Sequence, residues 1–351
     1  MSESVLHATK TANGRRKEDH LRIALSEEVG FKGRTTGLED YYFVHRALPE
    51  LDKERINLSL TLFGKSLSAP IVISAMVGGI GAAARLNRNL ASAAQSLGLA
   101  MAVGSQRCAI DDASLSASYQ VREVAPDILL FANLGAVQLN YGYGVHECRR
   151  AVDMIAADAL VLHLNPLQEA LQPMGNTDFS GLLDKIARVC RELPVPVVVK
   201  EVGWGISEEV AKKLVQAGVS AIDTAGSGGT CWSEVERRRT DSRAASEIAA
   251  TFACWGIPTA DSIQMVRRAM PGLPLIASGG IRTGLDVAKA IALGADAAGI
   301  ATPLLKAADE SADAATGELL RIIEELRLAM FCTGTARLAE LKFSTLLRRK
   351  A

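Results

Sequence analysis

The sequence predicts an α/β protein of the (β/α)8 TIM-barrel class, and three observations support this prediction. Eight short apolar segments recur along the chain, amphipathic segments separate them, and glycine-rich turns follow the last two. The apolar segments span Ile71–Ser74, Leu99–Val103, Ile128–Asn133, Leu160–Leu164, Val197–Glu201, Ala221–Thr224, Leu275–Ser278 and Ala297–Ile300. Near-continuous hydrophobic runs of this length are typical of parallel strands buried on both faces. Eight strand–helix units close into a barrel, and an open doubly wound sheet is the alternative.

The segments between the strands have the spacing of helices with one apolar face. They include Ala82–Ser96, Val145–Ile155, Ser180–Leu193, Ser207–Ala217 and Leu285–Leu293. Ser180 and Ser207 are expected N-caps, because a serine hydroxyl can accept from the first free backbone amides of a helix. Gly98, Gly218 and Gly294 are expected just past helix ends, where the backbone turns left-handed.

The chain divides into two parts by composition. Residues 1–65 are charged and should form an N-terminal arm and extension that covers the barrel mouth, while residues 66–349 should form a single barrel domain. The interval between the sixth and seventh strands is about twice the usual length, and we expect an active-site loop over Gly226–Thr240 plus extra helix. Residues 309–349 should form one or two closing helices.

Composition narrows the class of function. Lysine plus arginine and aspartate plus glutamate each number 39, so the net charge is zero and nothing indicates a nucleic-acid partner. An anionic ligand must therefore meet a local group of cations. The six cysteines form no CxxC pair, and the chain starts without an apolar leader, which together favour a reduced, cytoplasmic protein. The uncharged run over residues 66–84 contains Pro70 and clustered glycines, so we expect a strand and loop, and no membrane span.

Glycine turns after the last two strands predict a phosphate site. Ser278-Gly279-Gly280-Ile281-Arg282 follows the seventh strand, and Gly299-Ile300-Ala301-Thr302 follows the eighth. Glycines at a strand end expose backbone N–H groups, and a helix that starts there adds its positive dipole end. Barrel enzymes usually bind phosphate at this position, although tight turns alone would also need glycine.

Polar residues end the earlier strands. Lys200 follows four apolar residues, so we expect a cation at the barrel mouth near a planar cofactor or phosphate; a salt bridge with Glu201 or Asp223 is the alternative. Arg107 could pair with a phosphate through two hydrogen bonds, or be an ordinary surface arginine. Asn133 ends the third strand with an amide that both donates and accepts. The small residues of Ser74-Ala75-Met76-Val77-Gly78-Gly79 would let main chain lie flat against a planar ring.

The fourth strand ends in the richest cluster, His163-Leu164-Asn165-Pro166-Leu167-Gln168-Glu169. Strand alternation places His163 and Asn165 on one face, and Pro166 starts a turn that carries Gln168 and Glu169. A structural polar network is the alternative to a catalytic site. With one carboxylate and neither an HxxxH nor a DxD pair, the segment cannot enclose a metal by itself. A lone glutamate together with a substrate diphosphate does suit hydrated Mg²⁺.

A basic run near the N-terminus could complete such a site. It reads Arg15-Arg16-Lys17-Glu18-Asp19-His20. If the run is helical, Arg16 and His20 share a face, and with Lys17 they could clamp a diphosphate. A solvated basic tail is the alternative.

Taken together, these segments resemble the type 2, FMN-dependent isopentenyl-diphosphate delta-isomerases. The resemblance covers about residues 15–342. It includes RKEDH, SAMVGG, GSQR, HLNPLQE, VVKEVGWGIS, DTAGSGGTCW, WGIPT, SGGIRTG and AMFCTG. SGGIR and the strand-5 lysine also occur in other FMN barrels, so RKEDH and HLNPLQE are the discriminating motifs.

The resemblance implies an FMN-linked barrel that interconverts isopentenyl and dimethylallyl diphosphate in isoprenoid biosynthesis. It implies reduced FMN, Mg²⁺, and NADPH or NADH as the flavin reductant, in a homo-oligomer, a tetramer or an octamer. Residues implied at FMN are Ala75, Met76, Val77, Ser105, Asn133, Lys200, Thr230, Gly279, Gly280, Ile281, Ala301 and Thr302. Residues implied at the substrate are Arg16, Lys17, His20, Ser105, Arg107, Asn165, Gln168, Trp232 and Glu236. Catalysis is implied for Gln168 and His163, and Mg²⁺ binding for Glu169.

The chemistry supports this division of roles. Moving the double bond by protonation and deprotonation needs a strong acid and exclusion of water. Gln168 has no useful pKa, so we expect the flavin to act as acid and base, Gln168 to position the substrate and His163 to tune the site.

Three residues depart from the family pattern: Val77 replaces a common Thr, Ala225 replaces Ser in some members, and Asn176 replaces the usual Asp. We expect these departures to alter flavin tuning or affinity, and not the reaction.

Two other functions stay open on the sequence. An FMN-dependent oxidoreductase on the same barrel is the main rival. No histidine follows His163, which counts against a 2-hydroxy-acid oxidase, whereas Cys231 lies where an IMP-dehydrogenase-like enzyme would carry its nucleophile. A flavin-binding protein without turnover is the third function, against which His163, Gln168 and Glu169 count.

Overall fold

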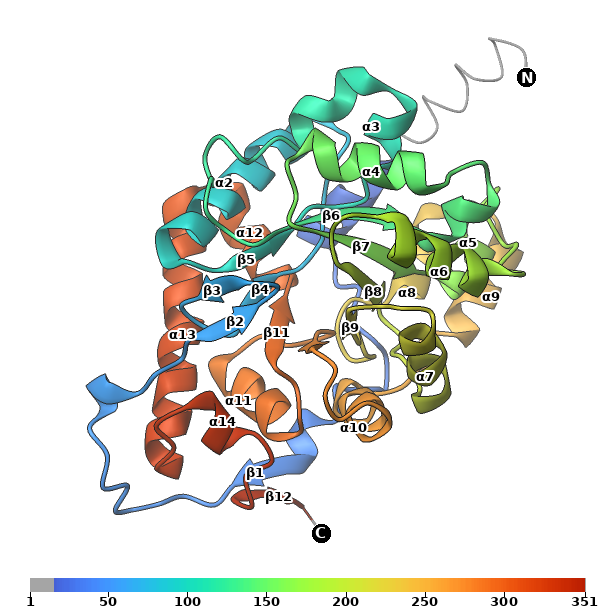
Figure 1. Ribbon diagram of the computed structural model, residues 1–351. Coiled ribbons are helices and arrows are strands. Elements are labelled where there is room, and N and C mark those ends of the chain that lie inside the picture. Colours follow the sequence, from blue (N-terminus) through green and yellow to red (C-terminus); the bar gives the residue numbers. More distant parts are fainter. Residues whose placement is uncertain (1–15, 351) are drawn as a thin grey trace, which may run out of the picture.

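Eight parallel strands form a closed ring at the centre of the computed structural model, which describes residues 16–350 (Figure 1). The strands are β4 (Ile71–Ile73), β5 (Ala100–Ala102), β6 (Leu130–Gly135), β7 (Ala159–Leu164), β8 (Val197–Glu201), β9 (Ala221–Asp223), β10 (Leu275–Ala277) and β11 (Ala297–Ile300). Each strand pairs with the next one along the chain, and β11 pairs with β4 to close the ring. The predicted TIM barrel is confirmed, and β8 and β11 have the predicted bounds.

The barrel interior is filled by small and β-branched residues, as the sparse aromatic content allows. Val72, Ala100, Val161 and Val198 belong to one buried cluster inside the ring, and Phe131 is its largest member. A hairpin of β2 (Leu60–Leu62) and β3 (Lys65–Leu67) adds Leu62 and Leu67 to the same cluster. Phe63 at the turn of this hairpin meets Phe131 edge to face at 6.2 Å. The hairpin therefore plugs the end of the barrel opposite the site.

Helices surround the ring and bury their apolar faces against it (Figure 1). Those after β4 to β7 are α2 (Gly81–Leu97), α3 (Arg107–Asp111), η3 (Ala113–Ser118), η4 (Ala136–Asn140), α4 (Val145–Met154), α5 (Pro166–Leu171) and α6 (Leu182–Glu192). Those after β8 to β11 are α7 (Glu208–Gln216), α8 (Trp232–Arg239), α9 (Arg243–Thr251), α10 (Thr259–Ala269), α11 (Gly284–Ala292), α12 (Thr302–Glu310), α13 (Ala312–Thr333) and α14 (Leu338–Leu341). In the described part of the chain, none of these helices has the length and apolar content to traverse a bilayer.

Local signals at helix ends were predicted well, with one error. Ser207 caps α7 by accepting from the Val210 amide, and Gly98, Gly218 and Gly294 all have left-handed φ angles just past helix ends. Ser180 does not cap α6, because Asp178 takes both its amide and its hydroxyl. The helix starts after Gly181 instead, which has a φ of 61°.

The long interval between β9 and β10 contains more helix than expected. The predicted loop over Gly226–Thr240 is a loop only as far as Cys231, and α8 occupies the rest. Glu234 stabilises this short helix by pairing with Arg237 one turn later at 2.8 Å. The loop that faces the site is thus short. The Gly226 amide at its start donates to the Ser278 carbonyl, and the Cys231 amide at its end donates to the Val29 carbonyl.

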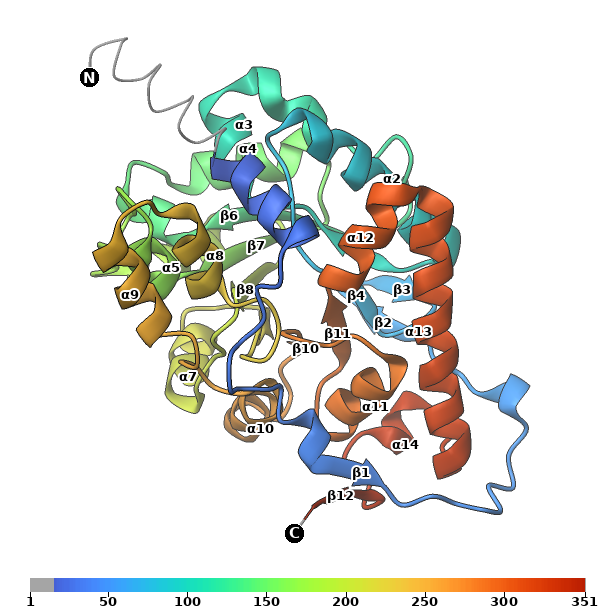
Figure 2. The same cartoon turned by 180° about the vertical axis from the view of Figure 1, so that it is seen from behind.

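The N-terminal extension runs across the face of the barrel, from the ends of β4 and β5 to β1 (Figure 2). Residues 16–26 are helical, and η1 (Leu38–Asp40), β1 (Tyr41–Phe43) and η2 (Lys53–Arg55) follow. The Cys231 amide donates to the Val29 carbonyl at 2.7 Å, which ties the extension to the β9 loop. β1 pairs antiparallel with β12 (Leu347–Arg349), a strand at the C-terminal end where only helices were expected. Residues 1–15 of the predicted arm, including Arg15 of the basic run, lie outside the described residues.

Candidate active site

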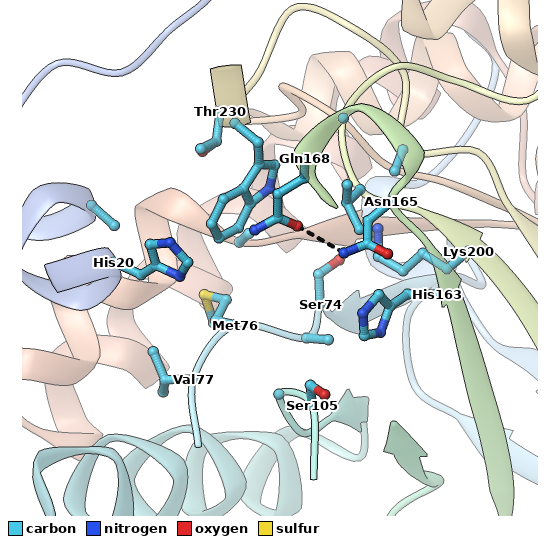
Figure 3. Close-up of a pocket in the computed structure, with 18 of the residues that line it drawn as sticks. His20, Ser74, Met76, Val77, Ser105, His163, Asn165, Gln168, Lys200 and Thr230 are labelled. Atoms are coloured by element: carbon cyan, nitrogen blue, oxygen red, sulfur yellow. Dashed lines mark hydrogen bonds between the residues drawn. The ribbon is translucent and has the colours of Figure 1, made fainter. Parts of the chain in front are cut away.

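A cavity of about 280 Å³ lies between the carboxyl ends of the barrel strands and the N-terminal helix over residues 16–26. Of the predicted site residues, all except Glu236 line this single cavity. They come from the arm, from every strand end from β4 to β8, from the β9 loop and from the turns after β10 and β11. Figure 3 labels ten of the lining residues, which come from segments far apart in the sequence.

One side of the cavity is built from main chain, and we call it the glycine wall: residues 226–230, 279–281 and 301–302. Gly279 has a φ of 100°, and a Cβ on it would lie 2.1 Å from the Gly226 carbonyl oxygen. A Cβ on Gly229 would lie 2.4 Å from the Gly280 amide nitrogen. The two loops therefore touch backbone to backbone, and only glycine fits at these positions. The amino end of α12, which begins at Thr302, lines the same cavity.

Lys200 stands beside this wall at the end of β8. Its Nζ donates to the Glu201 carbonyl at 2.9 Å and to Ser278 Oγ at 3.3 Å, and lies 3.7 Å from an Asp223 oxygen. Asp223 also accepts from Ser278 Oγ at 2.5 Å. Lys200 therefore lines the cavity, as predicted, and also forms the ion pair with Asp223 that was the alternative. Glu201 takes no part, because its carboxylate accepts from the amides of the next three residues, and burial raises its pKa to about 7.

His163 is held in one tautomer at the end of β7. Its Nδ1 lies 2.8 Å from Asn133 Oδ1, and an amide oxygen can only accept, so Nδ1 carries the proton. Burial lowers the pKa of His163 to about 4, with smaller contributions from the charges of Lys200 and Lys17. The ring is therefore neutral near pH 7 and offers Nε2 as an acceptor.

The helix α5 presents the amides and the carboxylate predicted for the reacting end. Asn165 Nδ2 donates to Gln168 Oε1 at 3.1 Å, the dashed line in Figure 3, and to Glu169 Oε1 at 3.0 Å. Glu169 Oε2 accepts from the side chain of Gln172 and, at 2.6 Å, from the Asn176 amide. These donors are all neutral, so the negative charge of Glu169 is left for a cation. Gln168 keeps its NH₂ group for a ligand.

The N-terminal arm contributes two cations, Arg16 and Lys17, on the side of the cavity opposite the strand ends. Arg16 Nη1 donates to Gln172 Oε1 at 3.2 Å. Lys17 is buried more deeply: its Nζ donates to the Gly78 carbonyl, the Ser105 carbonyl and Tyr119 Oη at 2.7, 2.9 and 2.7 Å. Burial lowers the pKa of Lys17. Three acceptors use all three of its N–H bonds, so Lys17 anchors the arm to the ends of β4 and β5. Together with Arg107, Glu169 and the rest of α5, these arm residues form what we call the charged wall.

His20 completes the arm side of the cavity. Its ring meets Trp232 edge to face at 5.1 Å, and its Nε2 donates to Glu236 Oε1 at 2.9 Å. Burial opposes ionisation of Glu236, but the contacts from His20 and Arg239 outweigh it and lower the Glu236 pKa. Glu236 itself is 2% exposed and lies behind His20, outside the cavity lining. His20 therefore lies between Glu236 and any ligand in the cavity.

The cavity fits a flavin phosphate cofactor. Two buried lining atoms, Ser74 Oγ and Asn165 Oδ1, have no hydrogen-bond partner in the described chain. The glycine wall offers a cradle that side chains would fill, and Ala75, Met76 and Val77 add small or flexible surface opposite it. For a metal ion the donor set is thin: residues 16–350 contain no group of three or more His, Cys, Asp or Glu that could hold one. Glu169 alone is consistent only with a cation that brings ligands of its own.

Gln172, Gln138 and Tyr119 hydrogen-bond to residues of the site and were not among the predicted site residues. Gln172 lies one helical turn after Glu169, a spacing that could have identified it. Gln138 and Tyr119 lie in short 3-10 segments or loops, and no local pattern marks them. Cys231, the nucleophile of the rival mechanism, is fully buried, with its sulfur 3.0 Å from Ser233 Oγ, and does not line the cavity.

Comparison with known proteins agrees with this geometry. The family model of the FMN-dependent dehydrogenases matches residues 11–121 and 151–348. An isopentenyl-diphosphate delta-isomerase of Nostoc sp. is 54% identical over 95% of each chain, and one of Stutzerimonas stutzeri is 52% identical over 96% of this chain and 97% of its own. One of Synechocystis sp. is 54% identical over 93% of each.

Solved structures that share the fold are more distant in sequence. A mandelate oxidase variant superposes with a TM-score of 0.65 at 19% identity, covering 97% of this chain and 99% of its own. A lactate oxidase of Pediococcus acidilactici gives 0.66 at 18% identity, covering 99% of this chain and 94% of its own. At this identity the likeness establishes the barrel architecture alone.

Proposed function

The chain belongs to the isopentenyl-diphosphate delta-isomerases, on the barrel of the FMN-dependent dehydrogenases, and on this premise we propose that it interconverts isopentenyl and dimethylallyl diphosphate with reduced FMN. The proposal depends on one observation: the glycine wall and the charged wall line the same cavity. The glycine wall suits the phosphate of a flavin, and the charged wall suits a diphosphate with Mg²⁺. An uncharged five-carbon group fits between them.

We assign the flavin to Ala75, Met76 and Val77 on one side and to Asn133, Lys200 and Thr230 on the other. Its phosphate would meet Gly279, Gly280, Ile281 and the Ala301-Thr302 turn. When bound, reduced FMN supplies an exchangeable proton and an electron-rich face. Lys200 holds a positive charge at this end of the barrel, and neutral His163 offers an acceptor at Nε2 without bringing a competing acid.

The remaining residues orient the substrate. Arg16 and Arg107 would bind the diphosphate, and Lys17 fixes the arm that carries Arg16. Ser105 would contribute its own side chain beside them, because its carbonyl already accepts from Lys17 and Tyr119. Glu169 would hold Mg²⁺ together with the diphosphate oxygens. Because substrate oxygens complete the coordination shell, the metal would arrive with the substrate.

At the other end of the substrate, Gln168 would position the carbons between which the proton moves, with Asn165 fixing its amide. Trp232 and His20 close the space above them, which excludes water from a cationic transition state. An aromatic ring beside a tertiary cation also stabilises it. Glu236 sets the orientation of His20.

We further propose a cytoplasmic homo-oligomer, a tetramer or octamer, that works in isoprenoid biosynthesis and uses NADPH or NADH as reductant. Its partners are small-molecule diphosphates.

The test is an anaerobic assay of the purified protein. We expect bound FMN absorbance and, with Mg²⁺ and NADPH, conversion of isopentenyl diphosphate. Reduced 5-deazaFMN should not support full turnover. A colourless protein that stays inert with added FMN and dithionite would refute the proposal. Replacing Cys231 with Ser should leave turnover largely intact, whereas an IMP-dehydrogenase-like enzyme would lose it.

A further inference from the structure

The loop over residues 172–176 folds back onto α5 and touches both functional ends of the charged wall. A Cβ on Gly175 would lie 1.8 Å from the Glu169 carbonyl oxygen, so the loop returns at backbone contact. This return brings the Asn176 amide to 2.6 Å from Glu169 Oε2. The main chain of Asn176 is therefore part of the cage that orients the Glu169 carboxylate.

The side chain of Asn176 points the other way, to Arg107. Its Oδ1 accepts from Arg107 Nη1 at 3.0 Å and from Gln138 Nε2 at 3.2 Å. Gln138 is 4% exposed, so this second donor is fixed inside the protein. One half-buried residue thus connects the arginine after β5 with the carboxylate on α5.

The chemistry of this link matters for binding. The carbonyl oxygen of an amide orients a guanidinium, but it does not neutralise it as a carboxylate would. The anion that pairs with Arg107 is Asp111, 3.8 Å away and partly exposed, which screens the charge only weakly. Arg107 therefore remains a net cation facing the cavity that it lines.

We propose that Asn176 is a positioning residue that aligns Arg107 and Glu169, so that one diphosphate can meet the arginine and the Mg²⁺ together. The proposal rests on the function inferred above. It requires an acceptor oxygen at position 176 and no direct contact between Asn176 and the substrate.

Three variants test this role. Asn176→Leu keeps the size of the side chain and removes the acceptor, and we expect a rise of about tenfold in the KM for isopentenyl diphosphate, with a smaller change in kcat. Asn176→Asp retains an acceptor oxygen at this position, so its KM should stay within about threefold of that of the parent. Thr177→Asp adds the same charge at an exposed neighbour and should leave KM unchanged.

A double-mutant cycle separates positioning from general support. If Asn176 acts through Arg107, then Arg107→Ala combined with Asn176→Leu should have the same KM as Arg107→Ala alone. The Mg²⁺ concentration for half-maximal rate should rise in Asn176→Leu, while the FMN absorbance of the purified protein should not fall.

Additive effects in the cycle, or equal losses in the Leu and Asp variants, would overturn the inference. So would an unchanged KM in Asn176→Leu. Failure of the parent protein to isomerise the substrate at all would instead refute the proposed function, so the two failures are distinguishable.

Discussion

The glycine wall and the charged wall enclose the same cavity but are built in opposite ways. In the glycine wall, the loops over residues 226–230 and 279–281 are in backbone contact, and a Cβ on Gly279 or Gly229 would fall 2.1 to 2.4 Å from main-chain atoms. The charged wall consists of side chains from the arm, the β5 turn and α5, and Arg16, Lys17 and Arg107 are each held by a partner from another segment. The first is fixed once the barrel forms, and the second depends on a lattice of individual hydrogen bonds. A single substitution in the glycine wall should therefore reduce both stability and flavin binding. A single substitution in the charged wall should change substrate kinetics and leave flavin binding intact.

The largest effect should follow from adding one methyl group to the glycine wall. Gly279→Ala would place a Cβ 2.1 Å from the Gly226 carbonyl oxygen at a φ of 100°, so the loop must move. We expect a loss of about 3–4 kcal/mol in unfolding free energy and purification without flavin. Denaturant unfolding and the visible spectrum measure both. The control is Gly272→Ala, because a Cβ on Gly272 would have no neighbouring atom within 4 Å and both properties should be kept. A yellow, stable Gly279→Ala protein would contradict this account of the wall.

A smaller and more selective effect is expected in the charged wall. Lys17→Met keeps most of the side-chain length but leaves the Gly78 and Ser105 carbonyls and Tyr119 without their shared donor. Unsatisfied buried acceptors cost roughly 2–3 kcal/mol, so kcat/KM should fall about 100-fold as the arm loosens. Flavin content should stay constant, since the glycine wall is untouched. Arg22→Ala, at an exposed arm cation, is the control. If Lys17→Met lost its flavin, the two walls would not be independent.

Between the walls, His163 should make stability depend on pH. Its folded-state pKa is about 4, against an ordinary value of 6.5, because burial disfavours the imidazolium. Below pH 6.5 the unfolded chain takes up this proton and the folded chain does not, so stability falls as pH falls toward 4. The loss should reach roughly 2 kcal/mol at pH 5. Urea unfolding from pH 7 to 5 should show a shallower decline for His163→Asn than for the parent. Parallel curves would show that His163 is not the group responsible.

The same contrast explains what could be predicted from the sequence. Two segments of the glycine wall, residues 279–281 and 301–302, were predicted from the short sequence motifs after the last two strands, because a strand end, a turn and a helix start are local features. The barrel followed from eight apolar runs for the same reason. His163 and Asn165 could be placed on one face from strand alternation alone. These predictions needed no knowledge of which distant segments would meet.

The charged wall could not be derived in this way, because its contacts join residues up to 156 positions apart, as in the pair of Arg16 and Gln172. The sequence placed Lys17 with the substrate cations, but the fold uses its ammonium to bind carbonyls. The family resemblance implied Glu236 at the substrate, whereas Glu236 lies behind His20, outside the cavity lining. Strand β12 was missed because three residues have no pattern of their own until they meet β1. Resemblance to a family identified which residues gather, and only the folded structure shows what each one touches.

The smallest expected effect is a change in FMN affinity on substitution of Val77, which lies where we propose that the flavin binds. Val77 lines the cavity, and its carbonyl accepts from the Gly104 amide at 3.1 Å, with Gly104 so close that a Cβ would lie 2.4 Å away. The main chain here is as fixed as in the glycine wall, so Val77→Thr can change only the side chain. The two residues have the same shape, and one added hydroxyl should alter FMN affinity by no more than about fivefold, or under 1 kcal/mol. Flavin titration of the apoprotein measures this, and Val77→Ala separates loss of shape from gain of the hydroxyl. Because the residues that we propose to orient the substrate lie on α5 and the arm, both variants should catalyse the same isomerisation, and a change of reaction type in Val77→Thr would contradict the division between the walls.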